Sequence, residues 1–194
     1  MHTPCGKINI SLPVLGYQNV SNALAASALA FSLHIPLKNI KNGLFNTPIL
    51  PGRLELIQLK THKILINDTY NANVSSMIAA IKVLEKMPGY KILVVGDMSE
   101  LGEKSLLYHK MIGNISNLSN IHEIFSIGSM SSEISQIFHN GQHFSNKKKL
   151  NFHLMNIILE KDNISILVKG SRNTKMEKII DYLIKENKKN VNVV

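Results

Sequence analysis

Cysteine is almost absent from this 194-residue chain, which contains only Cys5. A single cysteine excludes an internal disulfide framework and fits a protein that works in the reducing cytoplasm. No apolar run approaches the length of a membrane span, and the N-terminus lacks a basic segment followed by an apolar one. The sequence therefore predicts neither membrane insertion nor a signal peptide.

Acidic residues are also scarce, because 13 Asp and Glu stand against 22 Lys and Arg, for a formal net charge of +9 at pH 7. An excess of this size could serve a nucleic acid. The lysines are scattered, however, apart from short clusters at 147–149 and 185–189 on expected solvated helices. A composition rich in Lys, Asn and Ile explains the charge better, so we expect no nucleic-acid partner.

Two common kinds of site motif are missing. The sequence has no Gly-rich phosphate loop of the form G-x-x-x-x-G-K-[ST], and no His or Cys spacing that suggests zinc. The histidines are scattered, and we expect nearly all of them on the surface. No catalytic residue and no metal ligand can be identified in the chain from these patterns.

Residues 1–50 differ in pattern from the rest. Alternating apolar and polar residues predict a strand over 7–16, and Ala/Leu-rich segments predict helices over 19–34 and 36–46. The Pro- and Gly-containing segment 47–53 reads as a connector. We place a domain boundary there, between residues 50 and 51.

From Leu54 onward, short runs of Ile, Leu and Val alternate with segments of helical period. Strands are expected at 54–59, 63–68, 91–96, 123–128, 142–145 and 164–170. Helices are expected at 74–86, 104–118, 131–138, 147–161 and 174–187. Apolar strands with helices between them predict an α/β fold, a Rossmann-like, doubly wound and mostly parallel sheet with right-handed crossovers.

Three of these strands end in polar turns, "INDTYNAN", "VVGDMSELG" and "LVKGSRN". Ligands of such sheets bind outside the carboxyl ends of the strands, so the turns predict a site. Asp68 suits a ribose hydroxyl or a metal, whereas Asn73 is better explained as a cap of the next helix. Asp97 could pair with an amine, position another side chain or close an Asx-turn.

The "KGSR" turn offers the chemistry of an anion site. Backbone N–H groups of Gly170 and Ser171 before a helix can bind an anion, and the cations of Lys169 and Arg172 suit a carboxylate. Ser171 as a plain helix cap is the simpler alternative, but it leaves the two flanking cations unexplained. Three converging turns make a site more probable than any one of them alone.

The motifs resemble those of the bacterial Mur ligases. "GYQNVSNALAA", "PGRLE", "INDTYNANVSSM", "VVGDMSELGE" and "LVKGSR" occur here in the family's order and cover essentially the whole chain. The versions found here are most similar to those of the member that adds D-alanyl-D-alanine to UDP-MurNAc-tripeptide. The resemblance implies that residues 1–50 are the tail of the central ATPase domain and that residues 51–194 are the C-terminal Rossmann-like domain.

The resemblance also implies roles for individual residues. Asn19, Asn22, Arg53 and Asp68 match positions that bind the nucleotide, with Asp68 on the ribose side. On the side of D-alanyl-D-alanine, the resemblance implies a set of five residues: Asn71, Asp97, Lys169, Ser171 and Arg172. One departure is Gln18, where many members have His.

By the same resemblance, the ligase activates a peptide carboxylate with ATP and Mg²⁺ as an acyl phosphate, which an amine then attacks. The family's phosphate loop, metal ligands and modified lysine would precede residue 1, so we expect the chain to be inactive alone. A separate chain could carry the N-terminal half, as in a split or truncated gene. The alternatives are a non-catalytic module that binds a nucleotide or peptide, and a Mur ligase for another amine.

Overall fold

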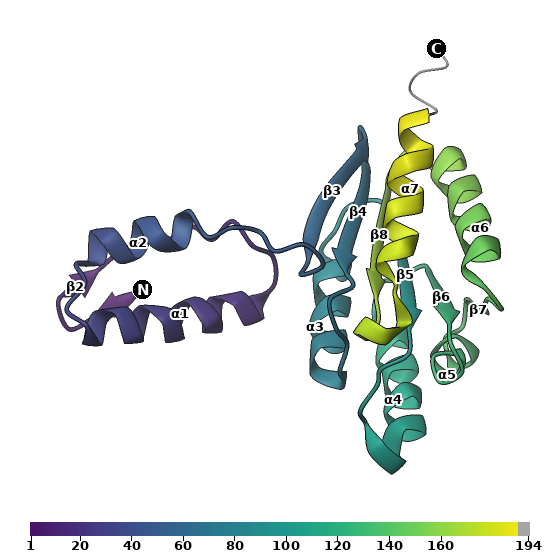
Figure 1. The fold of residues 1–194 in the computed structure, drawn as a ribbon, viewed down its shortest axis with the longest axis horizontal. Helices are drawn as coiled ribbons and strands as arrows, with labels where there is room; N and C mark the ends of the chain where they lie inside the picture. The colour runs from purple at the N-terminus through teal and green to yellow at the C-terminus, as the bar shows by residue number, and fades with distance from the viewer. Residues whose placement is uncertain (190–194) are drawn as a thin grey trace. The chain divides into compact units, whose positions relative to one another are not determined.

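The structure is a computed structural model that describes residues 1–189, and the chain divides into two compact units, Met1–Leu50 and a second that begins at Pro51 (Figure 1). The first unit contains a hairpin of β1 (His2–Thr3) and β2 (Gly6–Lys7), followed by helices α1 (Tyr17–Ser32) and α2 (Leu37–Phe45). No helix in residues 1–189 is both long and apolar enough to cross a membrane.

The prediction of a strand over 7–16 is wrong, because only Lys7 of that segment is in a strand. The segment alternates apolar and polar residues, but β1 and β2 pair over only two residues each, and Pro13 has no N–H for a ladder. Alternation alone therefore did not define a strand. The two predicted helices are confirmed, with Pro36 directly before α2.

The first unit buries few side chains, notably Ser27 and Ile40. Large apolar side chains of α1 are exposed instead: Tyr17, Val20 and Leu24 in its first half and Leu29 near its end. A unit with so little burial has a small hydrophobic core of its own.

The second unit contains a six-stranded sheet in the order β3-β4-β8-β5-β6-β7. The strands are β3 (Glu55–Lys60), β4 (Lys63–Asp68), β5 (Tyr90–Gly96), β6 (Glu123–Ile127), β7 (Gly141–His143) and β8 (Ile164–Lys169). Only β3 and β4 pair antiparallel, and the other neighbours are parallel. The predicted α/β class and mostly parallel sheet are confirmed.

Helices cover both faces of this sheet, as Figure 1 shows. They are α3 (Val74–Glu85), α4 (Ser105–Asn117), α5 (Ser132–Ile137), α6 (Lys147–Glu160) and α7 (Glu177–Lys189). The helices α6 and α7 pack on one face over a core that includes Phe125, Ile166 and Leu183. Side chains of a strand alternate between faces, so Leu93 and Leu167 point to the face covered by α3 and its neighbours.

The order of the strands brings the polar turns together. β8 lies between β4 and β5. Its last residue, Lys169, is paired in register with Asp68 of β4 on one side and with Val95 of β5 on the other. All six residues of β8 are buried. The turns after β4, β5 and β8 therefore leave the sheet side by side at one edge.

Candidate functional site at the carboxyl edge of the sheet

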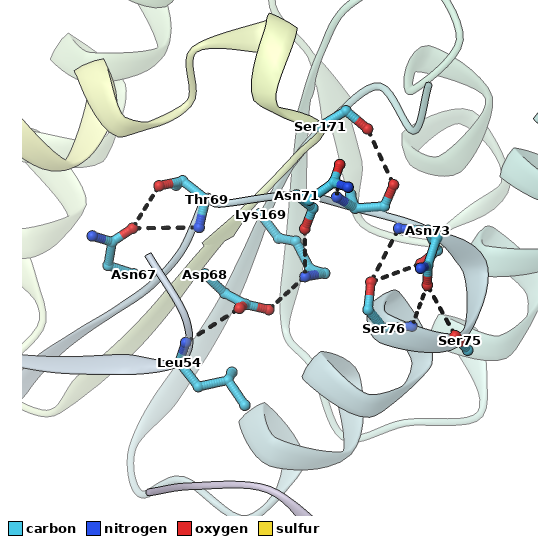
Figure 2. A network of polar contacts seen from close by, with 11 residues as sticks. Leu54, Asn67, Asp68, Thr69, Asn71, Asn73, Ser75, Ser76, Lys169 and Ser171 are labelled. Carbon is cyan, nitrogen blue, oxygen red and sulfur yellow. Dashed lines mark hydrogen bonds and ion pairs between the residues drawn. The ribbon is translucent and has the colours of Figure 1, made fainter. Parts of the chain in front are cut away.

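A buried ion pair links the ends of β4 and β8. The Lys169 ammonium donates to Asp68 Oδ2 over 2.6 Å and to the carbonyl of Asn71 over 2.9 Å. The side chain of Lys169 is 3% exposed and that of Asp68 12%. Figure 2 shows Nζ of Lys169 between the two acceptors. The pair joins residues 101 positions apart in the chain.

Burial raises the pKa of the Asp68 carboxyl, and the Lys169 ammonium, the Leu54 N–H and the Arg53 charge oppose that shift. Each oxygen of Asp68 accepts one hydrogen bond, from Lys169 or from the Leu54 amide over 3.2 Å. A carboxylate has about four lone-pair sites, so it retains capacity for a hydroxyl donor. Asp68 is therefore both a link within the fold and a ready acceptor at the strand end.

The connector before β3 is fastened to the turn after β4. The Tyr70 amide donates to the Gly52 carbonyl over 3.0 Å, and a side chain at Gly52 would press on the Tyr70 backbone. Gly52 has φ 76° and the buried Leu54 has φ 51°, a region that costs a non-glycine residue energy. The hydrogen bond from the Leu54 amide to Asp68 helps to hold this strained backbone in place.

Arg53 lies on the outer side of this connector. Its Cζ is 4.1 Å from the centroid of the Tyr70 ring, and both side chains are exposed. Stacking on an aromatic face orients a guanidinium while leaving its N–H donors free for an anion. The sequence pattern included Tyr70 in the turn but did not indicate this contact, which depends on the fold of the connector.

The asparagines of the "INDTYNAN" turn have mostly structural partners. Asn67 accepts from the Thr69 hydroxyl over 2.7 Å and donates to Glu55 over 2.9 Å. Asn73 caps α3, where it forms a reciprocal capping box with Ser76, as Figure 2 shows. The prediction of Asn73 as a cap is confirmed. The Asn71 side chain accepts only from the adjacent Ala72 amide and is exposed.

Ser171 joins all three turns. Its hydroxyl accepts from the Ser99 amide over 2.8 Å and donates to the Ala72 carbonyl over 3.1 Å, while its own amide donates to the Asp97 carbonyl over 3.0 Å. Ser171 precedes a 3-10 turn (Arg172–Thr174), but its side chain makes no capping hydrogen bond there. The simpler alternative of a plain cap is therefore wrong, and Ser171 instead fixes the turns to one another.

Asp97 contacts a fourth turn, the one after β6. Its Oδ1 accepts from the amides of Met130 and Ser131 over 3.0 and 2.7 Å, and Ser129 donates to Oδ2 over 3.4 Å. Gly128 has φ 129°, a backbone conformation that residues with a side chain rarely adopt, and a Cβ there would also overlap the Asp97 carboxylate. Of the roles open for Asp97, the structure supports positioning of a neighbouring segment.

Most histidines are exposed, in line with the prediction, and His109 is the buried exception. His109 of α4 is 0% exposed, and its Nε2 accepts from the Met98 amide over 3.0 Å. Its Nδ1 lies 2.8 Å from the Ser105 carbonyl, which fixes the neutral tautomer with the proton on Nδ1. The sequence did not single out His109, because scattered spacing does not reveal which helix positions face a loop. His109 anchors the turn that follows β5.

The turns enclose a cleft of about 610 Å³, within the range typical of small-molecule sites. It is lined by the turns after β4, β5 and β8 and by the start of α7. Its polar lining includes Asn71, Asn73, Ser171 and Arg172 from the predicted motifs, and also Glu100, Lys175 and Glu177. Asp68, Lys169 and Asp97 are not on its wall. Sequence patterns did not single out Glu177, because a Glu at the start of a helix is common.

The other two predicted residues lie in the first unit, at the start of α1. Asn22 donates to the Asn19 side chain over 3.2 Å, and Asn19 donates to the Leu15 carbonyl over 2.6 Å. Asn22 is exposed. The structure thus brings these two asparagines together.

Residues 1–189 contain no cluster of three or more His, Cys, Asp or Glu side chains that could hold a metal ion. The acidic groups at the sheet edge are instead separated, since Asp68 binds Lys169 and Asp97 binds backbone amides. The described residues therefore do not fit a complete Mg²⁺ site.

Comparison with known proteins identifies the family. The family profile "Mur ligase, glutamate ligase domain" matches residues 52–172. This chain belongs to the Mur ligase family. The resemblance in the motifs is thereby confirmed, and the turns after β4 and β5 and Lys169–Arg172 lie within the matched region, whereas Asn173, Lys175 and Glu177 of the cleft wall lie beyond it.

Individual Mur ligases match almost the whole chain. A UDP-N-acetylmuramoyl-tripeptide–D-alanyl-D-alanine ligase of Buchnera aphidicola is 70% identical over 189 residues, which are 97% of this chain and 42% of the relative. The crystal structure of MurF from Acinetobacter baumannii has a TM-score of 0.88 at 36% identity, covering 95% of this chain and 41% of that one. This chain spans about two fifths of the length of these relatives.

A more distant Mur ligase shows the same fold. MurF from Thermotoga maritima, solved in complex with ADP, has a TM-score of 0.76 at 23% identity and covers 91% of this chain and 40% of that one.

Proposed function

We propose that this chain serves as the C-terminal part of a ligase that uses ATP to add D-alanyl-D-alanine to UDP-MurNAc-tripeptide. The observation that carries the proposal is the Buchnera ligase, which is 70% identical over 97% of the chain. Under this proposal residues 1–50 are the tail of the central ATPase domain, residues 51–194 form the C-terminal domain, and the protein acts in the cytoplasm. The single, exposed Cys5 agrees with that compartment.

On the nucleotide side we assign Arg53 and Asp68 in the second unit and Asn19 and Asn22 in the first. Arg53 presents free N–H donors from its stack on Tyr70, and Asp68 has acceptor capacity for a ribose hydroxyl. In this assignment Lys169 is a positioning residue, since its ammonium holds the Asp68 carboxylate. ATP and Mg²⁺ would bind with residues of the rest of a full-length ligase.

On the amine side we assign the cleft to D-alanyl-D-alanine. Asn71, Ser171 and Arg172 line it, and the Arg172 guanidinium suits the dipeptide carboxylate. Asp97 and Lys169 act on this side through the turns that they hold. The chain's contribution to the reaction is then to orient the amine toward an acyl phosphate and to complete the nucleotide site.

The test is a chimera in which this chain replaces the matching 189-residue segment of the Buchnera ligase. We expect ATP-dependent phosphate release only when UDP-MurNAc-tripeptide and D-alanyl-D-alanine are both present. The variants Arg53→Ala and Asp68→Asn should raise the KM for ATP by about 10-fold or more, because each removes a charged hydrogen-bonding group from the nucleotide side. The control is Arg172→Lys, which should raise the KM for the dipeptide and leave that for ATP unchanged.

A folded chimera that releases no phosphate would contradict the proposal. Nucleotide binding without turnover would then favour a non-catalytic binding module. Activity of this chain by itself would contradict the expectation that it needs the rest of the ligase.

A further inference from the structure

Glu177 is the first residue of α7 and lies on the wall of the cleft. Its Oε2 is buried and has no hydrogen-bond partner in residues 1–189. Ion pairs in that part of the chain involve other carboxylates, and none includes Glu177. A buried carboxylate oxygen without a partner is rare, because its desolvation is not compensated.

The cationic side chains nearby do not donate a hydrogen bond to this oxygen. Lys147 donates to the Thr174 carbonyl over 2.7 Å rather than to Glu177. Lys175, which lines the cleft, is exposed and has φ 51°, a conformation that the turn before α7 imposes at some cost. Arg172 is also exposed on the cleft wall. Within residues 1–189, the cleft wall therefore combines a carboxylate that has one unpartnered oxygen with two cationic side chains that have no hydrogen-bond partner.

Such a wall is complementary to a small zwitterion. We infer that Glu177 receives the ammonium group of the incoming dipeptide, while Arg172 and Lys175 receive its carboxylate. This inference rests on the proposed function, because it takes D-alanyl-D-alanine as the ligand of the cleft. It assigns the ammonium to Glu177 rather than to Asp97, whose Oδ1 accepts from two amides outside the cleft.

The simpler account is that Glu177 only balances the positive end of α7. That role needs a charge at the helix start but no particular ligand. The two accounts differ in one measurable respect. Recognition of an ammonium makes affinity depend on the ligand's positive charge, whereas balance of the helix end does not.

The experiment titrates the ¹⁵N-labelled full chain with D-alanyl-D-alanine and with its N-acetyl derivative, which lacks the ammonium. Amide shifts of Ser99, Asn173 and Lys175 report binding in the cleft. We expect the acetylated ligand to bind about 10-fold more weakly or worse, since a hydrogen bond between charged groups is lost. In Glu177→Gln this discrimination should disappear, while the affinity for the acetylated ligand stays unchanged.

Glu100→Gln is the matched control, because Glu100 lines the same cleft and is exposed. It should keep the discrimination. The inference is overturned if Glu177→Gln still discriminates, if Glu100→Gln loses the discrimination, or if neither ligand shifts the cleft amides of the unmodified chain. These outcomes are separate from a failure of the proposed function, which is read from turnover of the chimera.

Discussion

Removal of the Lys169 ammonium should destabilise the second unit more than any surface substitution. Lys169→Met removes the 2.6 Å partner of the Asp68 carboxylate, whose side chain is only 12% exposed in the unmodified chain, and it removes a donor from the Asn71 carbonyl. Breaking a buried ion pair from one side typically costs about 3–5 kcal/mol. The free energy of unfolding of a whole domain is only about 5–15 kcal/mol, so the loss should be large.

The loss should also depend on pH. Burial already raises the pKa of Asp68 above its ordinary value of 3.8, and removing the opposing Lys169 charge raises it further. A carboxyl whose pKa is higher in the folded state destabilises the fold as pH rises from the unfolded pKa toward the folded one. The deficit of Lys169→Met should therefore be smallest near pH 4 and should grow toward pH 7, starting from about the ordinary Asp pKa.

The assay is urea unfolding followed by far-ultraviolet circular dichroism, with hydrogen exchange of the Leu54 amide as a local readout. Lys189→Met is the matched control, because Lys189 pairs with Glu186 at the surface with 59% of its side chain exposed. That control should change stability by less than about 0.5 kcal/mol. The double variant Asp68→Asn, Lys169→Met should cost less than the sum of the single changes.

Equal stability of Lys169→Met and Lys189→Met at pH 7 would contradict this prediction. Additive costs in the double variant would also refute it, because they would mean that the two side chains do not interact.

Three further changes test other contacts of the site. Ser171→Ala leaves the Ser99 amide without its acceptor and should lower the free energy of unfolding, measured by urea titration, by about 1–3 kcal/mol. The control is Ser75→Ala at an exposed position, which should leave the free energy of unfolding nearly unchanged. Asp97→Ala should speed hydrogen exchange of the Met130 and Ser131 amides and lower the free energy of unfolding by about 1–2 kcal/mol. Asp162→Ala, at an exposed position, should do neither. Unchanged exchange in Asp97→Ala would contradict the role assigned to Asp97. Partial burial and the hydrogen bond to Glu123 raise the pKa of Tyr90 to about 12, so Tyr90→Phe should remove the latest step of a tyrosinate absorbance titration, and Tyr17→Phe should not.

Local patterns were sufficient to predict the sheet and its edge. The run Lys63–Asp68 is a strand with the predicted bounds, because Leu65 and Ile66 are buried and a polar turn follows. The "KGSR" segment likewise follows the last strand. Parallel strands bring their carboxyl ends to one edge, so the place of the site follows from these runs alone.

Contacts across the sheet could not be predicted in the same way. Lys169 looked like a cation available to a ligand, but the register of β8 with β4 buries it against Asp68. The hydrogen bonds of His109 and Asp97 depend on how α4 packs against the turn after β5 and how that turn packs against the turn after β6. Each of these contacts joins segments whose separation in sequence leaves no local signal, and only the packed fold determines them.

The most direct test of the central claim is the identity of the product formed by the chimera with the Buchnera ligase. The chimera would be incubated with ATP, UDP-MurNAc-tripeptide and an equimolar mixture of D-alanyl-D-alanine, D-glutamate, L-alanine and diaminopimelate, and the products would be identified by mass spectrometry. We predict one product, the tripeptide extended by D-alanyl-D-alanine. A product that contains a different amine, or no product from a folded chimera that binds ATP, would contradict the account.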